Sequence, residues 1–132
     1  MSTPRAAAHA ALALELPTDV RVMAYARNID RPDRDVVMLR QDGVEPHPAA
    51  PESHRRYTLT AIVVGAKVDP DGGADDNLDA LLEDVLHAVE SSPILGWTEA
   101  RRGTWLNTTA PAYEVTVTVV HRKHPTTTEE TP

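Results

Sequence analysis

The sequence predicts a single α+β domain in which two helices cover a mainly antiparallel sheet of about five strands. The chain has 132 residues, which is enough for one hydrophobic core and too few for two. Short segments rich in β-branched residues predict strands, and one long segment with leucine and valine at helical spacing predicts a helix. Their order along the chain is helix, three strands, helix, two strands.

The first helix is predicted to start at Pro4 and to contain the alanine-rich residues 5–16, "RAAAHAALALEL". Ser2 or Thr3 can cap this helix, and Pro4 suits its first position because the N–H that proline lacks has no partner there. Pro17 ends the helix. The alanine-rich composition favours helix formation and gives the helix a packing face of small residues.

Two short strands are predicted next, at residues 20–26 ("VRVMAYA") and 35–40 ("DVVMLR"), and we expect them to be neighbours. Residues 41–54 ("QDGVEPHPAAPESH") contain three prolines and almost no large apolar side chain, so the sequence predicts an extended loop there. A loop of this length in a compact domain is usually functional or flexible.

The clearest strand is predicted at residues 55–66 ("RRYTLTAIVVGA"). Tyr57, Leu59 and Val63 fall on one face, and the second half of the segment is apolar on both faces. This pattern predicts a central strand that a helix covers on at least one side.

A long helix follows, with its apolar side chains on one stripe: Leu78, Leu81, Leu82, Val85, Leu86 and Val89. The acidic segment before it fails the pattern of an EF-hand calcium loop, because Ala74 and Ala80 stand at positions that need glycine and glutamate. We therefore expect Asp75, Asp76 or Asn77 to cap the helix and the aspartates to complement its dipole. A weak cation site at residues 69–76 stays open.

Two final strands are predicted at residues 97–105 ("WTEARRGTW") and 112–121 ("AYEVTVTVVH"); the second alternates apolar and polar side chains. Residues 123–132 have no apolar residue to anchor them, so they should form a polar tail. The domain itself is expected to span residues 1–122.

Composition excludes several functions. The net charge of −7 disfavours general binding to nucleic acid or to an anionic membrane, and without cysteine there is no thiolate metal site or cysteine nucleophile. We find no signal peptide, metal-binding histidine pattern, nucleophile elbow or phosphate-binding loop. The sequence therefore predicts a protein that is not an enzyme and that uses no metal or cofactor.

Tryptophan and arginine cluster in "WTEARRGTW", and two arginines precede Tyr57. These residue types are enriched at the centre of protein interfaces, so the candidate interface residues are Arg55, Arg56, Trp97, Arg101, Arg102 and Trp105. A stacking platform for nucleic acid, or one buried tryptophan beside solvated arginines, would give the same pattern.

The element order, the helix phrase "NLDALLEDVLHAVE" and the final strand "YEVTVTVVHR" resemble the tail terminator proteins of long, non-contractile-tailed bacteriophages. The resemblance covers about residues 3–122. It implies a homo-hexameric ring that caps the tail tube, stops polymerisation of the tube protein and joins the head-tail connector proteins of the neck. Such a protein is assembled in the bacterial host cytoplasm and becomes part of the virion, and DNA passes through its lumen without specific binding. An acidic ring fits this role, because like charge keeps the duplex from sticking.

Two other functions remain open. A head-tail connector or neck protein of the same particle would share the small α+β fold but would bind the head portal. A small cytoplasmic ligand-binding domain or dimeric enzyme would need a concave site with converging polar groups, and the sequence indicates no such set.

Overall fold

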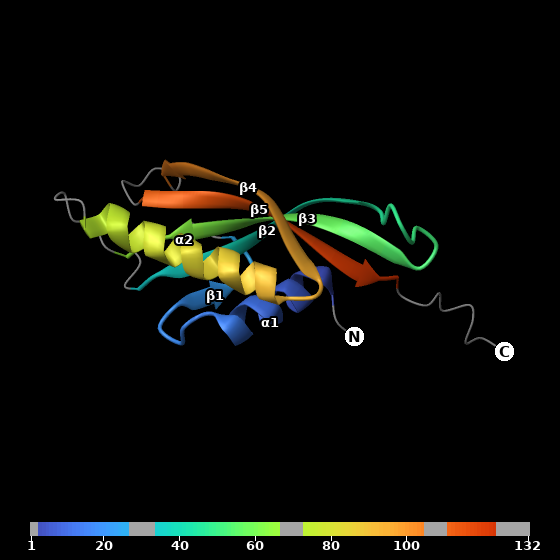
Figure 1. Cartoon of the computed structure of the whole chain (residues 1–132), viewed down its shortest axis with the longest axis horizontal. Helices are drawn as coiled ribbons and strands as arrows, with labels where there is room; N and C mark the ends of the chain where they lie inside the picture. The colour runs from blue at the N-terminus through green and yellow to red at the C-terminus, as the bar shows by residue number, and fades with distance from the viewer. Residues whose placement is uncertain (1–2, 27–33, 67–72, 105–110, 124–132) are drawn as a thin grey trace.

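The computed structural model describes residues 3–26, 34–66, 73–104 and 111–123. The elements are α1 (Pro4–Glu15), β1 (Arg21–Met23), β2 (Val36–Pro46), β3 (His54–Val64), α2 (Gly73–Ser91), β4 (Leu95–Thr104) and β5 (Pro111–Arg122). Both helices lie on the same side of one sheet (Figure 1). The order of elements and the α+β fold class are as predicted.

The five strands lie in the order β1-β2-β3-β5-β4. All neighbouring pairs are antiparallel except β1 and β2, which run parallel over three residues each. The central position of β3 is confirmed, and Ile62 and Val63, which point to opposite faces, are both buried. β1 is shorter than the predicted strand at residues 20–26.

Helix α1 begins and ends where the sequence predicts. The Thr3 hydroxyl accepts a hydrogen bond from the backbone N–H of Ala6 at 3.1 Å, so Thr3 is the N-cap. Leu16 already has an extended backbone, as expected for a residue before proline. Ala8 and Leu12 are buried against the sheet and α2.

Helix α2 begins earlier than predicted. It starts at Gly73, so Asp75 and Asp76 lie in its first turn instead of capping it, and the predicted cap at Asp75, Asp76 or Asn77 is wrong. The first-turn carboxylates still complement the positive end of the helix dipole. Asn77 instead donates a hydrogen bond from its side-chain amide to Asp35 Oδ1 at 3.1 Å, which ties the helix to the start of β2.

The predicted loop at residues 41–54 is also wrong in extent. β2 continues to Pro46 and β3 begins at His54, so the connection covers only residues 47–53. This half of β2 is exposed and needs no apolar side chains, because hydrogen bonds to β3 satisfy its backbone. A bulge between Gln41 and Gly43 keeps the two strands paired despite the irregular sequence.

The core lies between the helices and one face of the sheet. Every second residue of the three central strands contributes to it, as do the stripes of both helices: Ala8, Leu12, Leu16, Val20, Val37, Leu39, Leu59, Ala61, Val63, Leu78, Leu81, Val85, Ala88, Val89, Val115, Val117 and Val119. A smaller cluster on the opposite face contains Val36, Met38, Ile62, Val64 and Ala112. Within the described ranges, no helix is long and apolar enough to cross a membrane.

Candidate interaction surface

The sheet extends beyond the helices as a three-stranded projection, which we call the strand arm: residues 42–46 of β2, 54–56 of β3 and, at the end of β5, residues 120–123 (Figure 1). Along β2 the side chains are buried from Val36 to Leu39 and exposed from Arg40 onward. Packing against the core therefore does not explain why the outer half of β2 forms a strand. This half of the strand therefore offers an ordered, exposed surface on which a partner could bind.

One side of the strand arm is hollowed. Val44, Glu45, Pro46, Pro51, Arg55 and Lys123 line a shallow depression of about 290 Å³. Val44 is 55% exposed, so it adds apolar surface to the hollow. The hollow thus combines apolar surface with two cationic side chains.

Local hydrogen bonds order the tip of the strand arm. His47 Nδ1 accepts hydrogen bonds from the backbone N–H groups of Ala49 and Ala50, at 3.1 and 3.2 Å. The Lys123 N–H donates to the carbonyl of Ser53 at 2.8 Å, which fastens the end of β5 to the tip. These hydrogen bonds hold the backbone beside the hollow in place.

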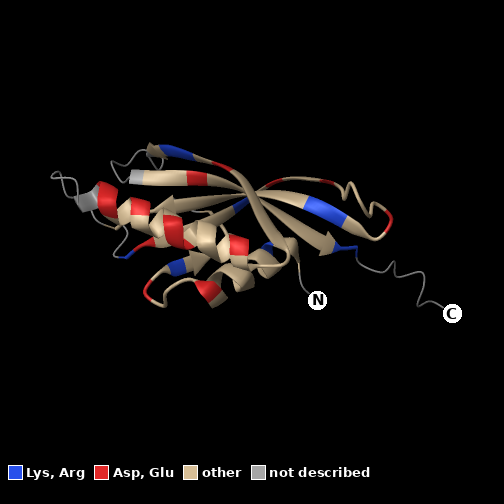
Figure 2. Cartoon of the chain, in the orientation of Figure 1, with Lys and Arg blue, Asp and Glu red and all other residues tan. Residues whose placement is uncertain are grey.

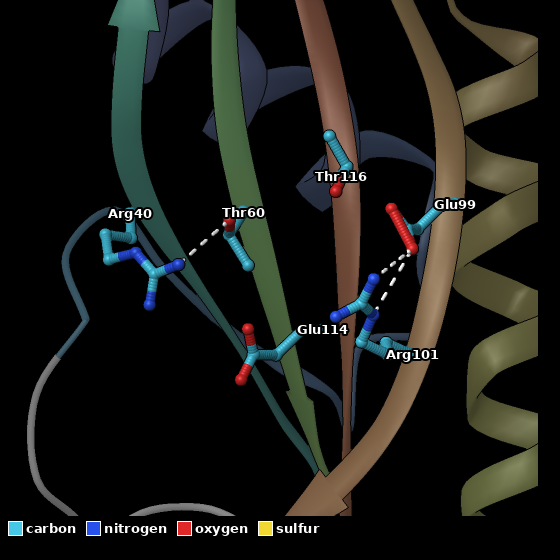
Figure 3. Close-up of a pocket in the computed structure, with 6 residues that line it drawn as sticks. All are labelled: Arg40, Thr60, Glu99, Arg101, Glu114 and Thr116. Carbon is cyan, nitrogen blue, oxygen red and sulfur yellow. Dashed lines mark hydrogen bonds and ion pairs between the residues drawn. The ribbon is translucent and has the colours of Figure 1, made fainter.

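A second hollow of about 250 Å³ lies on the sheet face that the helices do not cover (Figure 3). Its side chains come from four neighbouring strands: Arg40, Thr60, Glu99, Arg101, Glu114 and Thr116. The Arg101 guanidinium donates to Glu99 Oε2 at 2.9 and 3.2 Å, while Glu114 lies on β5, between β3 and β4. The surface is polar and its charges are largely paired.

Asp42, the bulged residue of β2, joins this face to the strand arm. Its carboxylate accepts hydrogen bonds from the Thr60 hydroxyl and from Arg40 Nε, the latter at 2.8 Å. Burial opposes ionisation of Asp42, but the hydrogen bonds from Thr60 and Arg40 and the charge of Arg40 outweigh it and lower its pKa. The hydrogen bond to Asp42 in turn raises the pKa of Arg40.

This contact predicts a pH dependence of stability. Because the pKa of Asp42 is lower in the folded chain, its ionised form stabilises the fold above the ordinary carboxyl pKa of about 3.9, and this stabilisation is lost as the pH falls through the folded pKa. We expect Asp42→Asn to lower the free energy of unfolding at pH 7 by less than about 1 kcal/mol, and the difference to vanish in acid. Urea denaturation at several pH values measures both.

The exposed Asp19→Asn serves as the control, and its free energy of unfolding should stay within about 0.5 kcal/mol of wild type at pH 7. An Asp42→Asn variant whose stability falls with acid as steeply as that of wild type would contradict the assigned role of this carboxylate.

The five predicted interface residues that the structure describes do not form one cluster. Arg55 and Arg56 lie in the strand arm on opposite faces of β3, where Arg56 pairs with Glu45 at 2.5 Å and Arg55 lines the hollow. Trp97 packs partly buried against the core and donates from Nε1 to Glu90 of α2 at 3.0 Å. Trp97 therefore stabilises the domain.

Arg101 and Arg102 of β4 also point to opposite faces of the sheet. Arg101 lines the hollow in Figure 3, whereas Arg102 pairs with Asp75 of α2 and lies over the ring of Tyr113, 5.6 Å from its centroid. Trp105 lies outside the described residues.

Sequence reasoning missed most residues of the two hollows. Val44, Glu45 and Lys123 fell in segments predicted as a loop and a tail, and no apolar alternation marked them as strand-associated. Thr60 and Thr116 carried a usable signal, because their alternation with buried residues placed them on the polar side of the sheet. Residues 69–72 of the open cation site lie outside the described residues.

The chemistry of these surfaces suits macromolecular contact. Both hollows are shallow and solvent-facing, and their charged groups are spread along strands instead of converging on one point. In the part of the chain that the structure describes, no three His, Asp or Glu side chains are grouped as a metal site would require. No protein-family model matches the chain, and a search of curated proteins finds no relative.

Proposed function

We propose that this chain is a bacteriophage tail terminator, a structural protein that forms a hexameric ring, ends polymerisation of the tail tube and joins the tail to the neck proteins. The observation that carries the proposal is the division of the sheet into a core half and a strand arm. A small domain whose strands extend past its own core is suited to contact a neighbour, as a ring subunit must. The assignment to tail terminators in particular is supported by the resemblance of the element order and of the helix segment "NLDALLEDVLHAVE" to that family.

The charge of the chain also supports this assignment. A net charge of −7 gives a ring of several copies a strongly acidic total. An acidic ring repels passing DNA and so prevents adhesion during packaging and ejection. The same charge would hinder a protein whose role is to bind DNA.

The test uses purified chain, alone and mixed with polymerising tube protein. We expect light scattering to give the mass of a hexamer, alone or after mixing, and negative-stain images to show rings at tube ends. Tubes grown with the chain should be shorter and capped. A stable monomer or dimer that leaves tube length unchanged would reject the proposal.

A neck protein is the alternative within the same particle. It would bind the portal complex of the head and leave free tubes uncapped, so adding portal to the same assay separates the two. The further alternative is a small ligand-binding domain or dimeric enzyme, for which the hollow on the free sheet face is the candidate site. A monomer or dimer that ignores both tubes and portal would favour this last function.

A further inference from the structure

Two cationic side chains, Arg55 and Lys123, line the hollow of the strand arm, which we call the arm hollow. None of the ion pairs among the described residues includes Arg55 or Lys123, although both line the arm hollow. The one carboxylate in the hollow, Glu45, is already paired with Arg56. A partner that fits this hollow should therefore present carboxylates.

Helix α2 presents such carboxylates at the other end of the molecule. Its segment, Gly73–Ser91, contains no lysine or arginine, and its acidic residues are Asp75, Asp76, Asp79, Glu83, Asp84 and Glu90. Asp76 and Glu83 are two turns apart on the exposed side. The exposed Ala80 between them leaves a small apolar gap in the acidic surface.

These two surfaces are complementary in charge, and each has an apolar part. The apolar part of the arm hollow, made by Val44, Pro46 and Pro51, can receive the exposed side of α2 at Ala80. Arg55 and Lys123 then meet the carboxylates on either side. This is the arrangement of a helix in a groove, with an apolar centre and a charged rim.

One chain cannot make this contact with itself. The first turns of α2 and the strand arm lie at opposite ends of the long axis, separated by the body of the sheet (Figure 1). Figure 2 shows the acidic residues along α2 and the basic residues on β3 and at the end of β5. Complementary patches at opposite ends of a subunit join copies head to tail, which closes a ring when the rotation per subunit allows it.

We propose that the strand arm of one copy binds the acidic face of α2 of the next copy, with Arg55 and Lys123 of the first against Asp76 and Glu83 of the second. This inference rests on the proposed ring and assigns the subunit contact within it.

Charge reversal tests the contact. The arm variant carries Arg55→Glu and Lys123→Glu, and the helix variant carries Asp76→Lys and Glu83→Lys. Each places like charges across the contact, so we expect each variant alone to assemble about 100-fold more weakly than wild type. Analytical ultracentrifugation measures assembly, and circular dichroism checks that each variant is folded.

Mixing the two variants separates a specific contact from general damage. An equimolar mixture lets each reversed arm meet a reversed helix and each native arm meet a native helix, so alternating rings should form. A variant with all four changes should assemble alone. The matched control reverses Glu15 and Asp19, exposed carboxylates beyond the proposed contact, and should assemble as wild type.

The outcomes distinguish this inference from the proposed function. Rings that form regardless of charge reversal, or a mixture that fails to restore assembly of folded variants, would overturn the contact while leaving the terminator in place. A change confined to the arm variant would show that the arm binds another partner. A wild-type chain that stays monomeric, even with tube protein, would overturn both.

Discussion

Leu12→Ala is expected to lower the free energy of unfolding by about 2–5 kcal/mol, the usual cost of removing a buried leucine side chain. Leu12 is fully buried where α1 packs on the core, so the substitution leaves a cavity between helix and sheet. A domain of this size has about 5–15 kcal/mol of stability in total. Urea denaturation followed by circular dichroism should show the midpoint shifting strongly to lower urea.

The same helix provides the matched control. Leu14 lies two residues further along α1 and is 82% exposed, so Leu14→Ala removes the same atoms from water-facing surface. We expect its effect to stay within about 0.5 kcal/mol, since surface substitutions of this kind are usually near neutral. Equal losses at the two positions would mean that α1 does not dock through Leu12.

Asp35→Ala should lower the free energy of unfolding by about 1–3 kcal/mol, because it leaves half-buried donors without an acceptor. Asp35 Oδ1 accepts from the backbone N–H of Ala66 at 2.9 Å and from the side-chain amide of Asn77 at 3.1 Å. This single oxygen connects the start of β2, the end of β3 and the first turns of α2.

Asp35→Asn keeps an oxygen at this position and is the control. Its free energy of unfolding should fall by less than about 1 kcal/mol, because a side-chain carbonyl can still accept from both donors. The same urea denaturation compares the two variants. If Asn were as damaging as Ala, the charge of Asp35, and not its role as acceptor, would be the stabilising feature.

The sequence predicted those elements whose signals are local. Thr3 caps the start of α1, and Pro17 ends the helix. The apolar side chains on both faces of residues 62–64 indicated that β3 is a central strand. The outer half of β2 could not be predicted in this way. Its backbone is satisfied by pairing with β3, a distant contact that leaves no apolar pattern in the strand itself.

The structure separates the predicted interface residues for a different reason. Residue type grouped Arg101 with Arg102 and Arg55 with Arg56, but adjacent residues of a strand point to opposite faces. The alternation that correctly divided β5 into a buried and a polar face also separates each of these pairs. Composition indicated which residues are suited to interfaces. Strand geometry decides which of these residues lie on the same face and can take part in the same interface.

The strand arm and the core are made of the same three strands, and this has a mechanical consequence. β2, β3 and β5 run from one region into the other with a single bulge, at Asp42 beside Gly43, and no loop between them. A force that pulls the arm along these strands therefore acts in shear on many backbone hydrogen bonds of the core at the same time. The direction in which the arm points is likewise set by the twist of the sheet, so repacking the core would tilt the arm.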